Sequence, residues 1–428
     1  MHDAAFLDRP TADDWRLLTT PPHAPRPHGV ARGISPAVEA VRQDPSHAGA
    51  FWERLVREGT PLVEGEGAER TYTWAHRGPA RRVALVAGKL TDDQTFRDAL
   101  FAPIEGTDLW TLTLRLGSAW RCTYGIAVDD GEAADPGPEL VERRRRSLAA
   151  TPPARHGDVA DWYDLLARVR PDRLAREEFR GSSVASGPDA PRIVDPQDPP
   201  APWRFVPVSI ASATGRARHA MWALPPETAF AERLVVLLDG DRRLADGPDL
   251  FAAWTHTHLA PRTAVLQLGH GDIAARDADL TANPALVDDL HRLICTSPVP
   301  VTDDPERTLI QGSSLGGLAA LFAQCIAPDR FGASVCQSGS FWWPNARSGH
   351  EAEWLTRVIR DAQPALGSVH LSVGTDEWVL TGPVRRMRDA VAPLARTLDY
   401  EEFDGGHDAP CWEAALPGVL RRLGFGPA

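Results

Sequence analysis

The residue of this sequence that is best suited to be a reactive group is a serine between glycines. The tract Gly312-Ser313-Ser314-Leu315-Gly316 fits the pattern G-x-S-x-G, in which glycines permit the sharp turn that exposes a nucleophilic serine. An apolar strand is expected before it over residues 307–311, and apolar residues recur at helical spacing after it over residues 318–326. Ser314 is therefore predicted on a strand-to-helix turn, and the sequence predicts a serine hydrolase.

Such a serine needs two partners. A hydroxyl is a weak nucleophile, so a histidine has to take its proton and a carboxylate has to orient that histidine. In α/β-hydrolases the acid and then the histidine follow the serine along the chain. The acid is expected at Glu377, with Asp376 in reserve, because an apolar strand ends in a glycine turn just before them. The alternative is that both acids only cap the following helix.

The histidine is expected at His407. Gly405 and Gly406 precede it after another strand, so this loop is free to turn the imidazole back over the sheet. The alternative is an ordinary histidine in a surface loop. Of the 14 histidines, His270 is the nearest rival.

Acyl transfer also requires N–H donors aimed at the oxyanion, one from the residue after the serine and one from an earlier strand end. The backbone N–H of Leu315 is the first candidate. The second is the N–H of Gly240 or Asp241, which follow an apolar strand at residues 234–238. An ordinary tight turn explains this second segment equally well.

Two tryptophans are candidates for the substrate pocket. Trp342 and Trp343 come shortly after a predicted strand and would open onto the same face as Ser314. Some of the 14 tryptophans must belong to the core, which is the alternative for both residues.

The elements that position these residues point to two domains, as a length of 428 residues also does. Short alternating strands predict an N-terminal β-sandwich of immunoglobulin type over residues 1–160, with a hairpin joined by Gly117-Ser118. Residues 161–203 are rich in proline and charged residues and are expected to be a linker. Strands alternating with helices predict an α/β-hydrolase domain over residues 204–428.

Composition excludes several classes of function. The chain is 43% apolar and 24% charged, with no apolar run long enough for a membrane span and no secretory signal in its first residues, so a cytoplasmic location is expected. A net charge of -12 argues against nucleic acid, and the run Arg143-Arg144-Arg145-Arg146 is interpreted as a helix cap or linker decoration. The five scattered cysteines indicate neither disulfides nor a zinc site.

With these residues in view, the chain resembles the enterochelin esterase family, hydrolases that cut the ester backbone of ferric catecholate siderophores. The resemblance covers nearly the whole length. Its most specific segments are Gly312 to Leu321, Pro328 to Gly332, Gln337 to Pro344 and Asp404 to Trp412, together with Phe51-Trp52, Gly59 to Glu64 and Gly106 to Trp110 in the N-terminal part.

The resemblance implies Ser314 as nucleophile, His407 as general base and an acid at Glu377. It also implies a cleft shaped partly by the sandwich, a small-molecule siderophore as partner, and no cofactor, since iron belongs to the substrate. The open alternatives are an acyl hydrolase, cyclase or thioesterase for another nonribosomal peptide, and an inactive siderophore-binding relative.

A ferric tris-catecholate is a trianion, so the cleft is expected to be positive even though the whole protein is acidic. Arg242, Arg243 and Arg276 follow predicted strand ends and are our candidates for this positive charge. The segment from Arg276 to Leu280 resembles an Arg-x-x-Glu-Leu element of the family, with Asp279 in place of Glu. The segments Gln267 to Asp272 and Asp241 to Arg243 depart from the family pattern, which leaves substrate identity less defined than reaction type.

Overall fold

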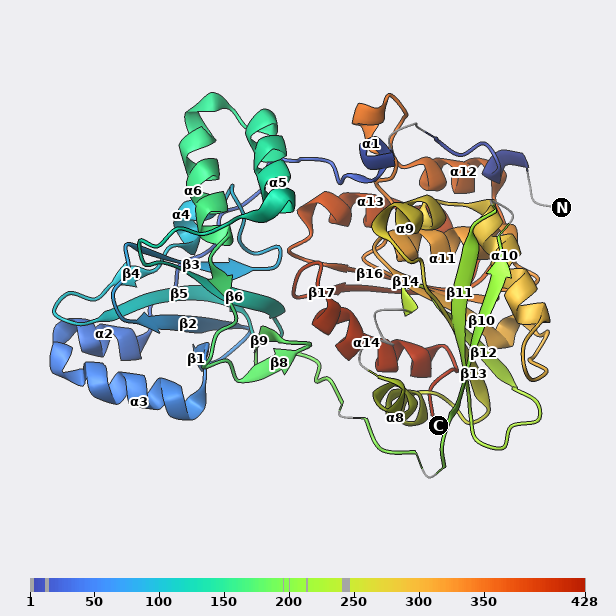
Figure 1. Cartoon of the computed structure of the whole chain (residues 1–428), viewed down its shortest axis with the longest axis horizontal. Coiled ribbons are helices and arrows are strands. Elements are labelled where there is room, and N and C mark those ends of the chain that lie inside the picture. Colours follow the sequence, from blue (N-terminus) through green and yellow to red (C-terminus); the bar gives the residue numbers. More distant parts are fainter. Residues whose placement is uncertain are drawn as a thin grey trace.

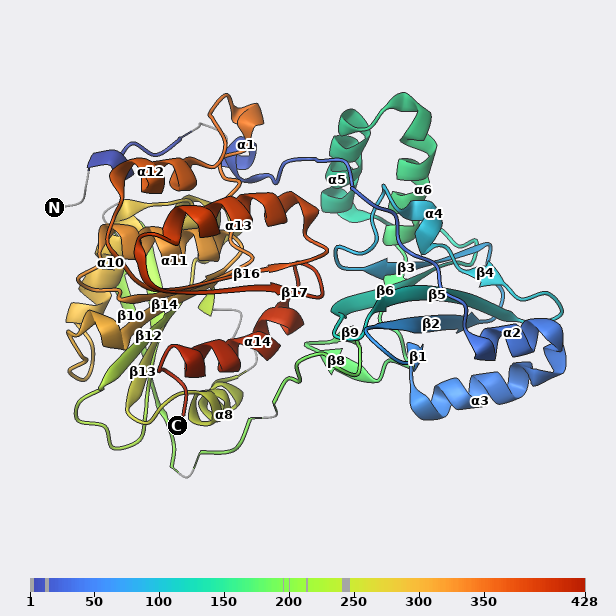
Figure 2. The same cartoon turned by 180° about the vertical axis from the view of Figure 1, so that it is seen from behind.

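The computed structural model describes residues 4–11, 15–194, 196–199, 201–212, 215–240 and 247–427. Two sheet-containing units lie side by side, with the N-terminal strands in one and the C-terminal strands in the other (Figures 1 and 2). Among the described helices, none combines the length and apolar character needed to cross a membrane.

The C-terminal unit is built on an eight-stranded sheet with the order β10-β11-β13-β12-β14-β15-β16-β17. Pairing is antiparallel among β10, β11 and β13 and parallel from β13 to β17. This confirms the predicted, largely parallel sheet. Its strands are β10 (Arg204–Ala211), β11 (Ala217–Leu224), β12 (Arg233–Leu237), β13 (Thr263–Leu268), β14 (Thr308–Ser313), β15 (Ala333–Gln337), β16 (Leu366–Gly374) and β17 (Ala395–Phe403).

Helices cover both faces of this sheet, which explains why its central strands are apolar throughout. One core contains buried side chains of α9, α10, α11, α12 and α13, and a second core lies under α8 and α14. The helices are α8 (Pro248–His258), α9 (Ile273–Leu280), α10 (Pro284–Cys295), α11 (Leu315–Ile326), α12 (Trp354–Ala362), α13 (Trp378–Val391) and α14 (Ala409–Arg422).

The N-terminal unit contains two antiparallel sheets, β1-β2-β5-β4 and β3-β6-β9-β8, with β7 paired to β6. One core takes buried residues from both sheets, so they form a sandwich. Its immunoglobulin-like topology stays a prediction. The strands are β1 (Leu62–Glu64), β2 (Glu69–Arg77), β3 (Arg82–Ala87), β4 (Ala102–Pro103), β5 (Leu109–Gly117), β6 (Arg121–Asp129), β7 (Val169–Arg170), β8 (Glu177–Phe179) and β9 (Ser182–Ser186).

Helices also cover the outer faces of the sandwich. Buried residues of α2 and α3 pack with the first sheet, and those of α4 and α6 pack with the second. The fifth helix, α5, has no buried residue and pairs with α6 above the sandwich (Figure 1). The bounds are α2 (Pro36–Gln43), α3 (Ala48–Glu58), α4 (Phe96–Ala99), α5 (Gly137–Ala150) and α6 (His156–Leu166).

The predicted hairpin at Gly117-Ser118 is wrong, although both of its strands exist. β5 pairs with β2 and β4, whereas β6 pairs with β3, β7 and β9, so the chain crosses from one sheet to the other. A Cβ at Gly117 would collide with the carboxylate of Asp404, which belongs to the other unit. The glycine therefore serves a close contact between the units, and the sequence pattern of a tight turn does not reveal this.

The segment expected as a linker, residues 161–203, differs from that expectation. It contains the end of α6 and the strands β7, β8 and β9, which are hydrogen-bonded into the second sheet. These strands are short and interrupted by polar residues, so their period of two is hard to read from the sequence. The connection to β10 begins only after Ser186.

The first described residues lie on the C-terminal unit and not on the sandwich. Phe6, in the 3-10 helix η1 (Ala4–Phe6), is buried in the main core of the hydrolase sheet. After the short helix α1 (Trp15–Thr19), the backbone oxygen of Ala24 accepts hydrogen bonds from Trp378 in one unit, at 3.1 Å, and from Gln94 in the other, at 3.2 Å. The chain thus passes from the C-terminal unit to the sandwich near residue 24.

Candidate active site

Ser314 lies on the predicted strand-to-helix turn, between β14 and α11. Its backbone has φ 60° and ψ -124°, a conformation that is strained for a residue with a side chain. Two backbone hydrogen bonds of 2.9 Å hold this turn, one from Ser314 N to Gln337 O and one from Ser340 N to Ser314 O. A Cβ at Gly312 would collide with the backbone of Gly316, so the pattern's first glycine is required by packing.

Glu377 and His407 form the partner pair that the sequence predicted. Nδ1 of His407 lies 2.6 Å from Oε1 of Glu377, and the other carboxylate oxygen accepts a hydrogen bond of 2.9 Å from Gly374 N. Glu377 is only 1% exposed, which strengthens these polar contacts. The imidazole packs edge-on against Trp412, with ring centroids 4.8 Å apart.

The reserve candidate, Asp376, points elsewhere. Its Oδ2 accepts a hydrogen bond of 2.9 Å from the indole N–H of Trp120, a residue of the sandwich. Burial raises the pKa of Asp376, and the nearby charge of Glu377 adds to this. The contacts therefore select Glu377 as the acid beside His407.

Ser314 and His407 line the same cavity. Within the described residues the Ser314 hydroxyl has no direct hydrogen bond to His407; its Oγ lies 3.4 Å from Oγ of Ser340. Catalytic hydrogen bonds are often long without substrate, and rotation about χ1 moves the serine oxygen between staggered positions. The structure thus places a serine on a strained turn and a carboxylate-bound histidine in the lining of one cavity.

Both predicted oxyanion segments lie at the start of α11. Leu315 is the first residue of this helix, where N–H groups have no partner within the helix. The turn containing Gly240 is adjacent, because a Cβ on Gly316 would lie 3.7 Å from both Leu238 and Asp239. Asp241, the other candidate, lies outside the described residues.

The cavity above Ser314 has a volume of about 680 Å³. Of the predicted substrate residues, Trp342 and Arg276 line it, and Arg242 and Arg243 lie outside the described residues. The prediction for Trp343 is wrong. This side chain is fully buried in the core and packs edge-on against Trp354, with ring centroids 5.8 Å apart.

Arg276 contributes less free charge to the cavity than expected. Its guanidinium holds both oxygens of Asp239 in a bidentate pair at 2.5 Å. Beneath it, the rival histidine His270 is buried and lies 2.9 Å from Asp279, which also pairs with Arg218. Burial alone would raise the pKa of Asp279, but the hydrogen bonds from His270 and Arg218 lower it overall. The network reaches the Asp239 turn through His270, whose Nε2 lies 3.8 Å from Oδ1 of Asp239.

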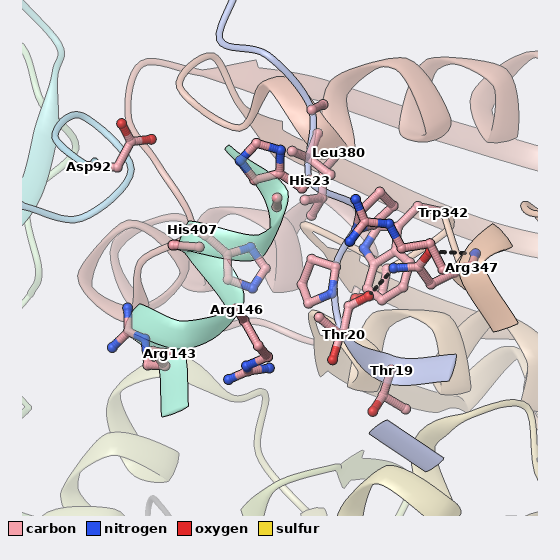
Figure 3. A pocket seen from close by; sticks show the side chains of 18 of the residues that line it. Thr19, Thr20, His23, Asp92, Arg143, Arg146, Trp342, Arg347, Leu380 and His407 are labelled. Carbon is pink, nitrogen blue, oxygen red and sulfur yellow. Dashed lines mark hydrogen bonds between the residues drawn. The ribbon is translucent and has the colours of Figure 1, made fainter. Parts of the chain in front are cut away.

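Three of the cations that line the cavity belong to the arginine run, for which the sequence analysis gave another role. Arg143, Arg145 and Arg146 of α5 all line it, and Arg143 and Arg146 project from that helix toward the cavity in Figure 3. The arginine run had been interpreted as a cap or linker decoration. Its spacing does not show which side of α5 faces a cavity formed with another unit.

Lys89, which follows β3 of the sandwich, also lines the cavity near His407. Its Cβ would lie 3.0 Å from a Cβ placed on Gly406. Burial lowers the pKa of Lys89, while attraction to Glu377 and Asp92 opposes that change. No pattern in the sequence distinguishes this lysine from a surface lysine.

Two family models match the chain. The model described as "Enterochelin esterase, N-terminal" matches residues 69–196, and the model described as "Putative esterase" matches residues 293–423. The first match extends through the segment that we expected to be a linker, in agreement with the strands found there.

Curated relatives match over most of their length. The iron(III) enterobactin esterase of Escherichia coli K12 is 26% identical over 87% of this chain and 93% of its own. The iron(III) salmochelin esterase of Escherichia coli O6:H1 is 25% identical over 86% and 91%. The crystal structure of ferric enterobactin esterase from Salmonella typhimurium is 26% identical, covers 88% of this chain and 98% of that chain, and has a TM-score of 0.69.

Proposed function

Because the chain belongs to the enterochelin esterase family, we propose that it is a serine carboxylic-ester hydrolase that cuts the ester backbone of a ferric catecholate siderophore. The observation that carries this proposal is one cavity that is lined both by Ser314 with the His407–Glu377 pair and by a group of cationic side chains, among them Lys89, Arg143 and Arg146. The first set attacks an ester, and the second binds an anion. The comparisons do not favour a thioesterase, a cyclase or an inactive relative.

In the proposed reaction, Oγ of Ser314 attacks the ester carbonyl while Nε2 of His407 takes the serine proton. Glu377 accepts the Nδ1–H of His407, so it fixes the tautomer that leaves Nε2 free and stabilises the imidazolium. The N–H of Leu315 and a donor from the Gly240 turn bind the oxyanion. His407 then protonates the departing alcohol, and water activated by the same imidazole releases the acyl group from Ser314.

Substrate recognition in this proposal depends on local charge. A tris-catecholate complex of iron(III) carries three negative charges, and charges farther away than about 8 Å are largely screened at physiological ionic strength. The cations lining the cavity therefore matter more to the ligand than the net charge of -12. Trp342 and Trp378 in the same lining offer flat surfaces for catechol rings. Iron enters only as part of the substrate, and the reaction uses no resident cofactor.

The same proposal includes two further points. We place the protein in the cytoplasm, a location supported by its five free cysteines, four of them buried, because thiols stay reduced in that compartment. We also assign the N-terminal sandwich to the immunoglobulin-like class, which is supported by two antiparallel sheets around one core.

The decisive experiment compares neighbouring serines. The parent enzyme and the variants Ser314→Ala and Ser313→Ala are incubated with ferric enterobactin, and the release of serine-linked catechols is followed by chromatography. We expect Ser314→Ala to lose at least about 10³-fold of the rate, because the nucleophile is gone. Ser313→Ala, on the same turn but outside the cavity lining, should keep most of it. Catechol release by Ser314→Ala at the parental rate would overturn the proposal.

A further inference from the structure

The loop that carries His407 is held against the sandwich. At the start of β6, Arg121 N donates to Asp404 O at 3.2 Å, and Arg121 and Gly405 form a parallel β-bridge. The thiol of Cys411 donates to Arg121 O at 3.3 Å. These contacts lie on both sides of His407 along the chain.

The two glycines before His407 make this approach possible. A Cβ on Gly405 would lie 2.8 Å from the backbone oxygen of Arg121, and one on Gly406 would lie 3.0 Å from Cβ of Lys89. Both values are too short for a relaxed contact. The sequence explains these glycines by freedom of the loop, whereas in the structure they allow the backbone of one unit to touch the other.

Asp408 adds a contact that is unusual for its position. It is the N-cap residue of α14, where an aspartate commonly accepts a hydrogen bond from its own helix, yet its side chain makes no such bond. Instead Oδ2 of Asp408 accepts the backbone N–H of Thr123 in β6. Similarly, Asp376, next to Glu377, accepts from Trp120. One short stretch of the sandwich thus contacts the immediate neighbours of both the base and the acid.

We propose that residues 120–123 of the sandwich are a positioning element for the His407–Glu377 pair, acting through Asp408 and Asp376. The inference rests on the proposed function, because it concerns how the proposed base is held. Its physical reason is that a loop with two glycines has high conformational entropy, and a displacement of about 1 Å at a catalytic group can reduce a rate by about 100-fold. The sandwich then supports the chemical step as well as forming part of the cavity wall.

A positioning role and a wall role predict different kinetics. If the sandwich only shapes the cavity, weakening its contact with the loop raises KM for a large siderophore and spares a small ester. If it positions His407, the same change lowers kcat for both. The small neutral ester p-nitrophenyl acetate, which needs little of the cavity, is therefore the discriminating probe.

The test uses Asp408→Ala, the conservative Asp408→Asn, which keeps an oxygen acceptor, and the matched control Asp304→Ala. Asp304 is an exposed N-cap residue whose bond to Glu306 N, 2.9 Å, lies away from the cavity. We expect kcat of Asp408→Ala to fall about 10- to 100-fold for p-nitrophenyl acetate and for ferric enterobactin alike. Asp408→Asn should recover most of that loss, and the control should match the parent.

Hydrogen–deuterium exchange of the backbone gives a readout that does not depend on activity. The proposal expects faster exchange at residues 404–412 in Asp408→Ala than in the parent, with no change in the Asp304→Ala control. Unchanged exchange there, or an unchanged kcat with a raised KM, would overturn the positioning role. A parent protein that exchanges as expected but hydrolyses neither ester would instead overturn the proposed function alone. If Asp408→Ala is not recovered folded, Trp120→Phe removes the donor to Asp376 and is judged by the same criteria.

Discussion

Glu377 and Asp376 are adjacent along the chain, yet their carboxylates have different partners. Glu377 binds His407 and a backbone N–H, whereas Asp376 binds Trp120 of the sandwich. A change at Glu377 therefore acts on the tautomer of the base, and a change at Asp376 acts on the contact between the units.

At Glu377 we predict a large loss from a small change. In Glu377→Gln the side-chain amide can donate to Nδ1 of His407, which favours the tautomer whose Nε2 already carries a proton and cannot accept one from Ser314. We expect kcat to fall on the order of 10⁴-fold, as when the acid of a Ser-His-Asp triad is replaced by its amide. Steady-state hydrolysis of p-nitrophenyl acetate checks this.

Asp376→Asn is the matched control, since an asparagine oxygen can still accept from Trp120. It should reduce kcat much less than Glu377→Gln does. Equal losses in the two variants would contradict the assignment of Glu377 as the acid.

At the scale of residues, the sequence was sufficient to predict that Ser314, His407 and Glu377 come together, because each follows a strand of one sheet, and all three line one cavity. Their catalytic roles stay a proposal. It was insufficient for Trp343, because two neighbouring tryptophans look alike until the backbone directs one to the cavity and the other to the core. Lys89 could not be found at all, since its importance arises from a contact between units.

Helix α5 supplies three of the arginines that line the cavity. It has no buried residue, and its arginines divide by direction: three line the cavity, while Arg144 pairs with Asp164 of α6 at 3.1 Å. Arg145 pairs closely with Glu142, at 2.7 Å, whereas Arg146 reaches the same carboxylate only at 3.8 Å. Arg143 and Arg146 are therefore the best candidates for contacts with an anionic ligand.

For this helix we predict that the double substitution Arg143→Ala/Arg146→Ala raises KM for ferric enterobactin by at least about tenfold, the effect of losing one charge-assisted contact. The value of kcat should change little, because neither residue touches the triad. The dependence of KM on salt concentration should also weaken.

Arg144→Ala is the matched control, because it removes an arginine from the same helix but not from the cavity. It should leave KM within about twofold of the parent, the range expected for an exposed ion pair. A similar increase in both proteins would point to a general effect on α5 and would contradict specific recognition.

At the scale of elements, the strands and helices of the hydrolase sheet could be predicted because their apolar periodicity is strong. The pairing of β5 and β6 could not, since a sequence predicts that a strand exists better than it predicts which strand lies beside it. The same applies to β7, β8 and β9, because β7 and β9 are strands through their pairing with β6, and β8 through its pairing with β9.

The interface between the two units contains a half-buried acid. Asp404, beside Gly117 of the sandwich, has its pKa raised to about 6 by burial and by the charge of Asp376, while a hydrogen bond with Thr375 opposes this. In the unfolded chain its pKa returns to about 3.8. The folded state therefore binds this proton more tightly, and the resulting stabilisation is complete below about pH 4 and lost as pH rises through about 6.

Because this stabilisation is lost above about pH 6, we predict that Asp404→Asn stabilises the protein at pH 8. At that pH the parent holds a charged carboxylate in the interface. Because the side chain is partly exposed, the gain should be about 1 kcal/mol in the free energy of unfolding. Denaturant unfolding at pH 5 and pH 8 checks it, and the gain should shrink at pH 5. A variant that is less stable than the parent at pH 8 would contradict the prediction.

The contacts of residues 8–20 affect the order in which the protein folds during synthesis. Asp8, Arg9 and Thr20 are hydrogen-bonded to Trp354, Thr281 and Asn345, partners that lie 272 to 346 positions later along the chain. When the ribosome has released the sandwich, the surface that receives this leading segment has not yet been translated. The nascent chain must keep residues 8–20 unattached until the segment from 281 to 354 emerges, so these residues are made well before they can reach their native place.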